Sequence, residues 1–158
     1  MSVSVSMTGL RDLEKQIERL KPATGKSSLR SSLRSVGEPL AADMRQRAPA
    51  DPDGQQSLKK SIGVGTRLEK RQAGLHRKMF RDDKASVEIF VGPSYSLGDG
   101  GRHGHLQEFG TRHHPAQPFA RPAWDAARGT LLDRLSAAMW ANVERSISRA
   151  DKRGTLRG

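Results

Sequence analysis

The chain of 158 residues contains no cysteine, which excludes disulfide bonds and thiolate chemistry and makes a reducing cytosol a natural place of synthesis. Only 34% of residues are hydrophobic and 4% aromatic, so we expect a small, largely aliphatic core with segments covered by neighbouring subunits. No run approaches the roughly 20 apolar residues that cross a bilayer. The segment Met1–Met7 lacks the basic start and apolar block of a signal peptide. We therefore expect no membrane contact and one domain over residues 1–150, followed by a basic flexible tail over 151–158.

Acidic side chains are also scarce, with 17 Asp and Glu against 28 Lys and Arg and a net charge of +11. Such a charge favours nucleic acid, an anionic membrane or an acidic protein surface as a partner. The densest basic segment runs from residue 67 to 84 and carries a net charge of +4, seven basic minus three acidic residues. We interpret this segment as a partner-binding loop. Its basic residues are Arg67, Lys70, Arg71, Arg77, Lys78, Arg81 and Lys84.

Apolar residues at helical spacing predict two helices in the first part of the chain. Leu10, Leu13, Ile17 and Leu20 share one face of a first helix that ends before Pro22. The same periodicity over residues 29–44 predicts a second helix, with a kink or break at Gly37 and Pro39.

The middle of the chain changes to the alternating pattern of strands. Alternation over residues 58–64 and 87–91 predicts two strands, with residues 67–84 as a long hairpin loop. The glycine-rich residues 94–104 predict a mobile loop. A long amphipathic pattern from Trp124 to Ile147, with Pro122 at its start, predicts a C-terminal helix. The fold class is therefore α+β: two N-terminal helices, a small antiparallel sheet with a long hairpin loop, and a C-terminal helix packed on the sheet.

A distinctive block follows the glycine-rich loop. It reads HLQEFGT over residues 105–111 and PFARPAW over residues 118–124. Gly110 is free to take a positive φ, Thr111 can bond the turn backbone, and Glu108 can accept a hydrogen bond from an amide or an arginine. We interpret Phe109 as a buried aromatic, and Phe119 and Trp124 as anchors of the last helix. We therefore interpret the block mainly as a folding determinant; the alternative is that its exposed part makes subunit contacts.

This block resembles the tail-completion and head–tail joining proteins of long-tailed bacteriophages, a family that includes neck and minor tail components. The order of the preceding segments, with Ala48–Pro49 followed by Gly54 and Ser57–Ile62, is similar to that of the same family. The family motif falls on Leu106, Glu108, Phe109, Gly110, Thr111, Pro118, Phe119, Arg121, Pro122 and Ala123.

The resemblance implies a structural virion protein rather than an enzyme, with no cofactor. It would assemble in the bacterial host cytoplasm and reside at the neck or tail top, where it completes the tail and joins it to the DNA-filled head. The resemblance further implies a homo-oligomeric ring, hexameric when matched to the tail. Its partners would be the head-closure protein and the tail terminator or tail tube, and contact with phage DNA in the channel is a further expectation.

Two other interpretations compete with this one. The basic charge alone suits a protein that binds nucleic acid without sequence preference, although the few aromatics look like core residues and no base-reading motif is present. His103, His105, His113 and His114 lie close together and suggest a metal-dependent enzyme, but no cysteine completes a ligand set and the loop is rich in glycine. We interpret these histidines as surface residues and predict neither a metal site nor a catalytic residue.

Overall fold

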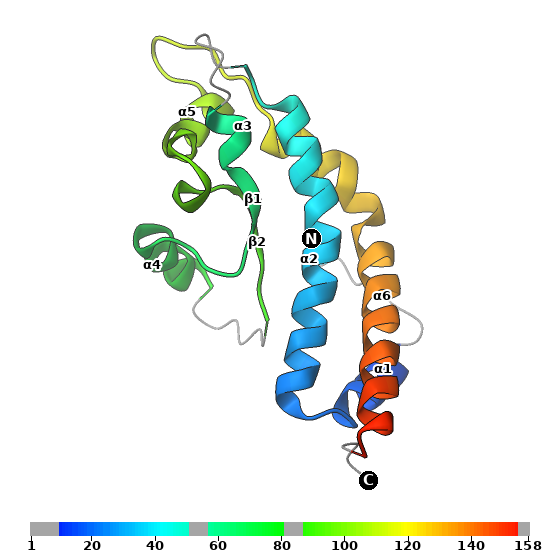
Figure 1. Ribbon diagram of the computed structural model, residues 1–158. Helices are drawn as coiled ribbons and strands as arrows, with labels where there is room; N and C mark the ends of the chain where they lie inside the picture. Colours follow the sequence, from blue (N-terminus) through cyan, green and yellow to red (C-terminus); the bar gives the residue numbers. More distant parts are fainter. Residues whose placement is uncertain (1–9, 51–56, 81–86, 155–158) are drawn as a thin grey trace.

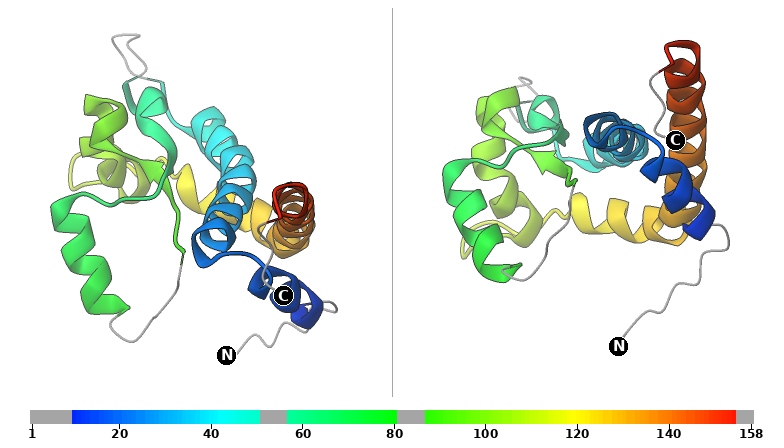
Figure 2. Two further views of the ribbon diagram at one scale, coloured as in Figure 1. Left: turned by 60° about the horizontal axis from the view of Figure 1, so that its bottom comes forward. Right: turned by 90° about the horizontal axis from the view of Figure 1, so that it is seen from below.

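The computed structural model describes residues 10–50, 57–80 and 87–154. In chain order the elements are α1 (Leu10–Glu18), α2 (Pro22–Arg47), α3 (Ser57–Ser61), β1 (Ile62–Gly65), α4 (Lys70–Met79), β2 (Phe90–Pro93), the 3-10 helices η1 (Tyr95–Leu97) and η2 (Asp99–His103), α5 (Gly104–Phe109) and α6 (Ala120–Lys152). The two long helices α2 and α6 lie side by side, and the hairpin with α3, α4 and α5 lies on the other side of α2 (Figures 1 and 2). The predicted α+β class is confirmed. Among the described helices, none is long and apolar enough to span a membrane.

Small polar residues let α2 and α6 approach closely. Ser32 is fully buried; its hydroxyl donates to the carbonyl of Ala138 at 3.2 Å and accepts from the side-chain Nδ2 of Asn142 at 2.9 Å. One turn earlier, the hydroxyls of Ser28 and Ser146 lie 2.6 Å apart. Because each buried polar group has a partner, this contact fixes the register of the two helices at little desolvation cost.

A kink or a break is predicted at Gly37 and Pro39; the helix α2 continues past Pro39, so the break is wrong. Proline removes one backbone donor, which leaves the carbonyl of Ser35 without its helical partner. Both residues are exposed, so water can satisfy that carbonyl and the helix loses little. Gly37 has a packing role instead. A Cβ at this position would lie 3.0 Å from Ile89 and 3.2 Å from Val91, so the glycine lets the hairpin rest on α2.

The sheet contains two antiparallel strands in the described structure, with Ile62 opposite Pro93 and Val64 opposite Val91. The strand predicted from residue 58 begins only at Ile62, because residues 57–61 form α3. Leu58 and Ile62 are four residues apart, and that spacing fits one helical turn as well as alternation. The sheet closes the main core, which consists of Leu40, Ala41, Met44, Ala48, Leu58, Ile62, Val64, Phe119 and Ala123.

The loop predicted over residues 67–84 is wrong for Lys70–Met79, which form α4. The loop predicted over residues 94–104 contains η1 and η2, and η2 packs tightly on α3. A Cβ on Gly100 would clash with the backbone of Ser57 and Leu58, so this part of the loop is held by close contact. At the C-terminal end, α6 continues through Lys152.

The C-terminal helix packs chiefly along α2, and α1 packs against its far half. Its first half faces the hairpin across an apolar groove, described below, to which Trp124 of α6 and Val91 of β2 both contribute. The start of α6 lies within hydrogen-bonding distance of Glu108 in α5, where the HLQEFGT block ends.

Candidate functional site: a capped junction and a basic surface

Glu108 joins the end of α5 to the start of α6. Its Oε2 atom accepts hydrogen bonds from the amides of Phe119 and Ala120, both at 2.8 Å, and Oε1 accepts one from the amide of Arg121 at 2.9 Å. These are amides at the N-terminus of α6, where a helix has no internal acceptors to offer. Phe119, at the N-cap position, makes no side-chain capping bond, so the distant carboxylate takes that role.

The intervening chain folds back so that this contact can form. Gly110 ends α5 with a φ of +72°, and a Cβ there would lie 2.7 Å from the amide nitrogen of Ala116. Thr111 then bridges to His114 through its amide at 2.8 Å, and its hydroxyl accepts from the amide of His113 at 3.2 Å. The turn returns the chain toward α5, and the two halves of the sequence block form one structural unit.

The carboxylate of Glu108 stays ionised in this setting. Glu108 is 8% exposed, and burial by itself would raise its pKa. The hydrogen bonds from the amides of Ala120, Phe119 and Arg121, together with the charge of Arg121, outweigh burial and lower that pKa below its ordinary value. The predicted amide bonds to Glu108 and the predicted roles of Gly110 and Thr111 are confirmed.

The three aromatics of the block differ in burial. Phe119 is 1% exposed and anchors α6 in the core, as predicted. Phe109 is 62% exposed, so its predicted burial is wrong, and Trp124, at 47%, is only a partial anchor. The Arg121 guanidinium carbon lies 4.9 Å from the centroid of the Phe109 ring, a cation–π contact that holds the ring at the surface. Arg and Phe are enriched in protein interfaces, and this pair is presented to solvent.

The remaining residues of the motif support the same junction. Ala123 is fully buried against the core, and Leu106 and Pro122 are half-buried. Pro118 is exposed at the end of the returning turn. None of these four side chains presents a reactive group, which agrees with a structural role for the block.

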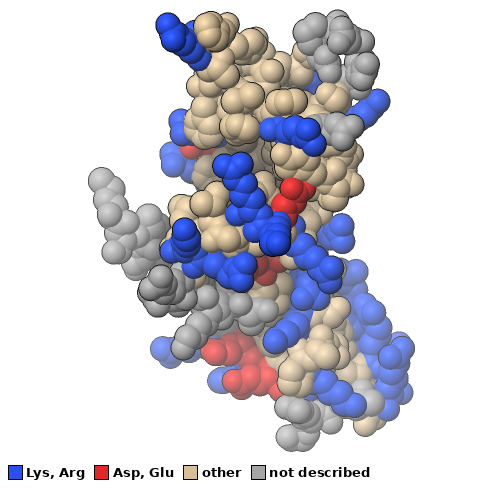
Figure 3. All heavy atoms as spheres, turned by 90° about the vertical axis from the view of Figure 1, so that its left-hand side faces the viewer, with Lys and Arg blue, Asp and Glu red and all other residues tan. Residues whose placement is uncertain are grey.

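The basic segment forms a surface around α4. Arg67, Lys70, Arg71, Arg77 and Lys78 are all exposed, while Arg81 and Lys84 lie outside the described residues. The helix is held by His76, whose ring lies 5.3 Å from that of Phe90 and whose Nε2 lies 3.5 Å from a carboxylate oxygen of Glu88. On the face of the molecule shown in Figure 3, Lys and Arg side chains far outnumber Asp and Glu among the charged groups.

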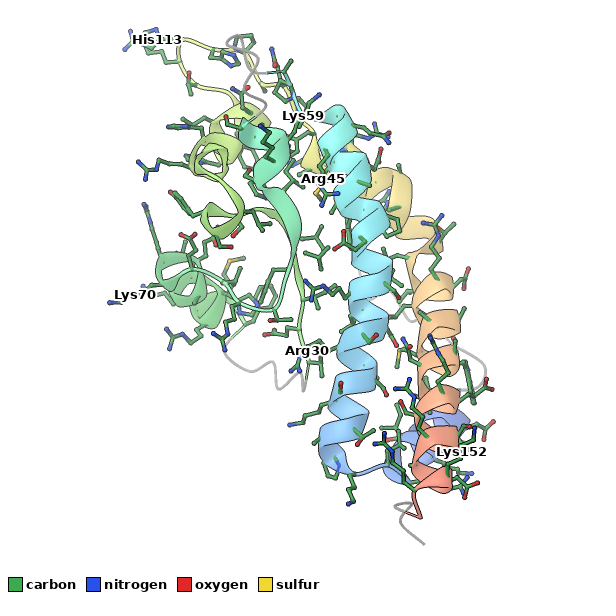
Figure 4. The ribbon with its side chains drawn as sticks, in the orientation of Figure 1. Arg30, Arg45, Lys59, Lys70, His113 and Lys152 are labelled. Atoms are coloured by element: carbon green, nitrogen blue, oxygen red, sulfur yellow. The ribbon has the colours of Figure 1, made fainter. Side chains whose placement is uncertain are left out.

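A second group of cations lies in a shallow groove between α2 and β1, which we call the basic groove. Arg45 Nε donates to the carbonyl of Ile62 at 2.8 Å, and Arg34 donates to that of Val64 at 3.5 Å, so both arginines cover the free edge of β1. Lys59 and Lys60 complete the groove, and Glu38 is its one carboxylate. Arg45 points from α2 toward β1, and Lys59 lies beyond it on α3 (Figure 4). The sequence did not identify Arg34 and Arg45 as site residues, because the strand β1, whose free edge they cover, lies far from them in the sequence.

The histidine-rich segment shows no metal-binding geometry in the parts of the chain that the structure describes, where no three His, Asp or Glu residues group around a common point. His113 lies at the tip of the turn, pointing away from the core (Figure 4). His103, His105 and His114 are also exposed. The described surface thus offers basic and aromatic contact groups, which defines a protein suited to binding other macromolecules.

Comparison with protein families identifies that class more closely. Residues 11–110 match the family described as "Bacteriophage HK97-gp10, putative tail-component". This span is more than half of the chain, so the chain belongs to this family of phage tail components, and the resemblance seen in the sequence is confirmed. The family is a structural one, not a known enzyme family. Comparison with curated proteins and with solved structures finds no match.

The matched span ends at Gly110, in the middle of the HLQEFGT…PFARPA block. It includes Glu108 but stops before Phe119, Ala120 and Arg121, whose amides Glu108 binds. The buried carboxylate of Glu108 therefore ties the start of the helix beyond the matched span to the family domain, in addition to the packing of α6 along α2.

Proposed function

We propose that this tail component acts at the neck or tail top, where it completes the tail and joins it to the DNA-filled head as one subunit of a ring around the DNA channel. The family membership carries this proposal, and the Glu108 junction supports it, because the whole motif builds a rigid platform for the exposed Phe109–Arg121 pair. A ring of six would match the symmetry implied by the resemblance. The neighbours would be the head-closure protein on one side and the tail terminator or tail tube on the other.

Deletion of the gene from its phage tests the joining role. Because the protein would act after heads and tails are both complete, its absence should leave DNA-filled heads and separate tails. Negative-stain electron microscopy would show them. A plasmid copy of the gene should restore joined particles and serves as the control. Normal infectious particles from the deletion strain would contradict the proposal.

In this proposal the basic surface of α4 contacts protein in the assembled particle. A strongly basic lining of the channel would hold DNA phosphates and slow DNA exit. The charge-reversed triple variant Arg71→Glu, Arg77→Glu, Lys78→Glu should fold, since all three side chains are exposed, yet fail to assemble. The matched control reverses Arg128, Arg149 and Arg153, exposed residues of α6 and its C-cap. Infectious particles with abnormal DNA ejection from the α4 variant would instead place that charge in the channel.

Binding to nucleic acid without sequence preference is the second candidate, favoured by the net charge of +11 and by the cationic face in Figure 3. Such binding depends steeply on salt, since each phosphate contact releases counterions. Titration of a DNA duplex at several salt concentrations separates the two functions. Tight binding near physiological salt, together with normal particles from the deletion strain, would favour this candidate.

A further inference from the structure

The two outer edges of the hairpin differ in how the rest of the fold covers them. The amide of Ser94 donates to the carbonyl of Ser61, which fixes the pairs of the antiparallel ladder that exchange hydrogen bonds. The backbone groups of Ile62 and Val64 therefore point away from β2, where the two arginines of the basic groove bind their carbonyls. By the same alternation the amide and carbonyl of Val91 point away from β1, and no strand of the described residues pairs with them. Proteins usually protect strand edges, so this open edge is suited to pairing with an added strand.

An apolar groove of about 270 Å³ lies beside the open edge. The hairpin residues Ile89 and Val91 line it, whereas β1 lines the basic groove instead. The other walls include Leu33 and Leu40 of α2 and Trp124, Leu131 and Leu135 of α6. An apolar cavity of about 150 Å³ holds a benzene molecule, so this groove has room for about two large side chains. A strand paired with Val91 would place every second side chain, roughly 7 Å apart, on the groove side.

The chain itself contains a segment with the pattern that this edge requires. Residues 1–9, 51–56, 81–86 and 155–158 lie outside the described structure, and only the first of these segments has apolar residues at strand spacing. Over residues 1–7 a methionine or valine stands at every odd position and a serine at every even one. Such alternation is typical of a strand with one apolar face. The other three segments are polar apart from Pro52, Ala85 and Leu156.

The groove of a neighbouring copy suits this segment better than the groove of its own copy. Two residues separate Met7 from Leu10, the first residue of α1, and three Cα steps span at most about 11 Å. The helix α1 lies beside the second half of α6, on the side of α2 and α6 that faces away from the hairpin (Figures 1 and 2). The groove lies against the first half of α6. Within one copy the segment would have to pass around a helix to reach it, which favours a neighbour.

We propose that residues 3–7 of one copy add as a strand to the Val91 edge of a neighbouring copy, with Val3, Val5 and Met7 on the groove side. This inference rests on the ring proposed above and names a contact that links its subunits. The backbone of Val91 supplies the hydrogen bonds, and the groove receives the alternate side chains. Pro93 has no amide, so the pairing is centred on Val91. Because the segment and the groove differ, the contact is head-to-tail, the kind that closes into a ring when the rotation fits.

Engineered disulfides test this contact, because the chain has no cysteine of its own. The double variant Val5→Cys, Leu131→Cys should give, on mild oxidation, a ladder of covalent multimers on a non-reducing gel. Each single variant should give dimers at most. The matched control, Ser4→Cys with Leu131→Cys, moves the thiol to the other face of the strand and should give a much weaker ladder. Equal ladders from the two pairs, or a disulfide closed within one chain, would overturn the proposal.

Glutamate substitutions on the two faces of the segment test its part in assembly. Val5→Glu should shift the protein to the monomer in sedimentation velocity, because an ionised carboxylate is costly to bury in an apolar groove. Ser4→Glu, on the opposite face, should keep the wild-type size, and circular dichroism checks that both variants fold. Hydrogen exchange followed by mass spectrometry measures the edge itself. The amide of Val91 should exchange slowly in the wild-type oligomer and fast in the Val5→Glu protein.

The outcomes separate this inference from the proposed function. A Val5→Glu protein that keeps the wild-type oligomer, with the Val91 amide exchanging fast in both proteins, would overturn the strand contact and leave the joining role standing. If the amide exchanges slowly in both proteins, another segment occupies the edge and the proposal fails. Monomeric wild-type protein, with normal particles from the deletion strain, would remove both the strand contact and the joining role.

Discussion

Removal of the Glu108 carboxylate should destabilise the protein more than removal of any exposed charged group. Glu108→Ala leaves three amides at the start of α6 without their acceptor, and one of them belongs to the buried Phe119. Hydrogen bonds to a charged group contribute about 1.5–3 kcal/mol each, and a lost helix cap costs about 0.5–2 kcal/mol. Water can reach the amide of the exposed Arg121, so we expect a total loss of roughly 2–4 kcal/mol rather than the sum of three full bonds.

Thermal unfolding followed by circular dichroism at pH 7 measures this loss. For a chain of this size, 1 kcal/mol corresponds to roughly 2–4 °C, so a loss near 3 kcal/mol lowers Tm by about 6–12 °C. Glu144→Gln, an exposed substitution on α6, is the control and should leave Tm nearly unchanged. A Glu108→Ala protein as stable as this control would refute the capping role.

The pH dependence of the Tm difference between wild type and a Glu108 variant gives a second check of the capping role. The pKa of Glu108 is lowered in the folded state, because its amide bonds and Arg121 outweigh burial, so the folded state binds its proton less readily than the unfolded state does. The stabilisation is therefore complete above the ordinary value of 4.5 and is lost as pH falls through the lower folded pKa. The Tm difference between wild type and Glu108→Gln should be constant above about pH 6 and shrink below about pH 4. A difference independent of pH would mean that the carboxylate charge contributes nothing.

Two further pairs of variants test the placement of residues around this junction. Phe119→Ala should lower the free energy of unfolding by roughly 3–5 kcal/mol and yield insoluble or protease-sensitive protein. Phe109→Ala should stay within about 1 kcal/mol of wild type. Equal losses of stability for the two variants in urea unfolding would contradict the difference in burial between these side chains. Gly110→Ala should destabilise, because φ is +72° and the new Cβ would meet the backbone of Ala116, whereas Gly129→Ala, in open space on α6, should stabilise by about 0.5–1 kcal/mol. A stabilising Gly110→Ala in the same assay would show that the turn differs from the one described.

Sequence reasoning predicted the long helices well and α4 poorly, for one physical reason. The helices α1 and α6 bury one face, and burial imposes the apolar spacing that a sequence displays. The helix α4 buries nothing, so its formation rests on the propensity of residues such as Lys70, Arg71 and Gln72, which leaves no periodic signal. A helix without a buried face therefore has the sequence pattern of a charged loop.

The candidate site was predictable where chemistry constrained it. Glu108 followed by Gly110 indicated a carboxylate that accepts amides beside a turn with positive φ, and both features were found. Which amides it binds could not be predicted, since the partners depend on how the turn returns the chain. Phe109 was misplaced because an aromatic residue is buried by default, and the Arg121 guanidinium that covers its ring follows only from the three-dimensional path.

Complementation in vitro tests the joining role most directly. An extract of cells infected by the deletion phage would contain filled heads and free tails, to which purified protein is added before plaques are counted. The account predicts that wild-type protein raises the infectious titre by orders of magnitude and yields joined particles under the microscope, while the folded triple variant Arg71→Glu, Arg77→Glu, Lys78→Glu does not. Filled heads and tails that stay separate after addition of folded wild-type protein would contradict the joining role.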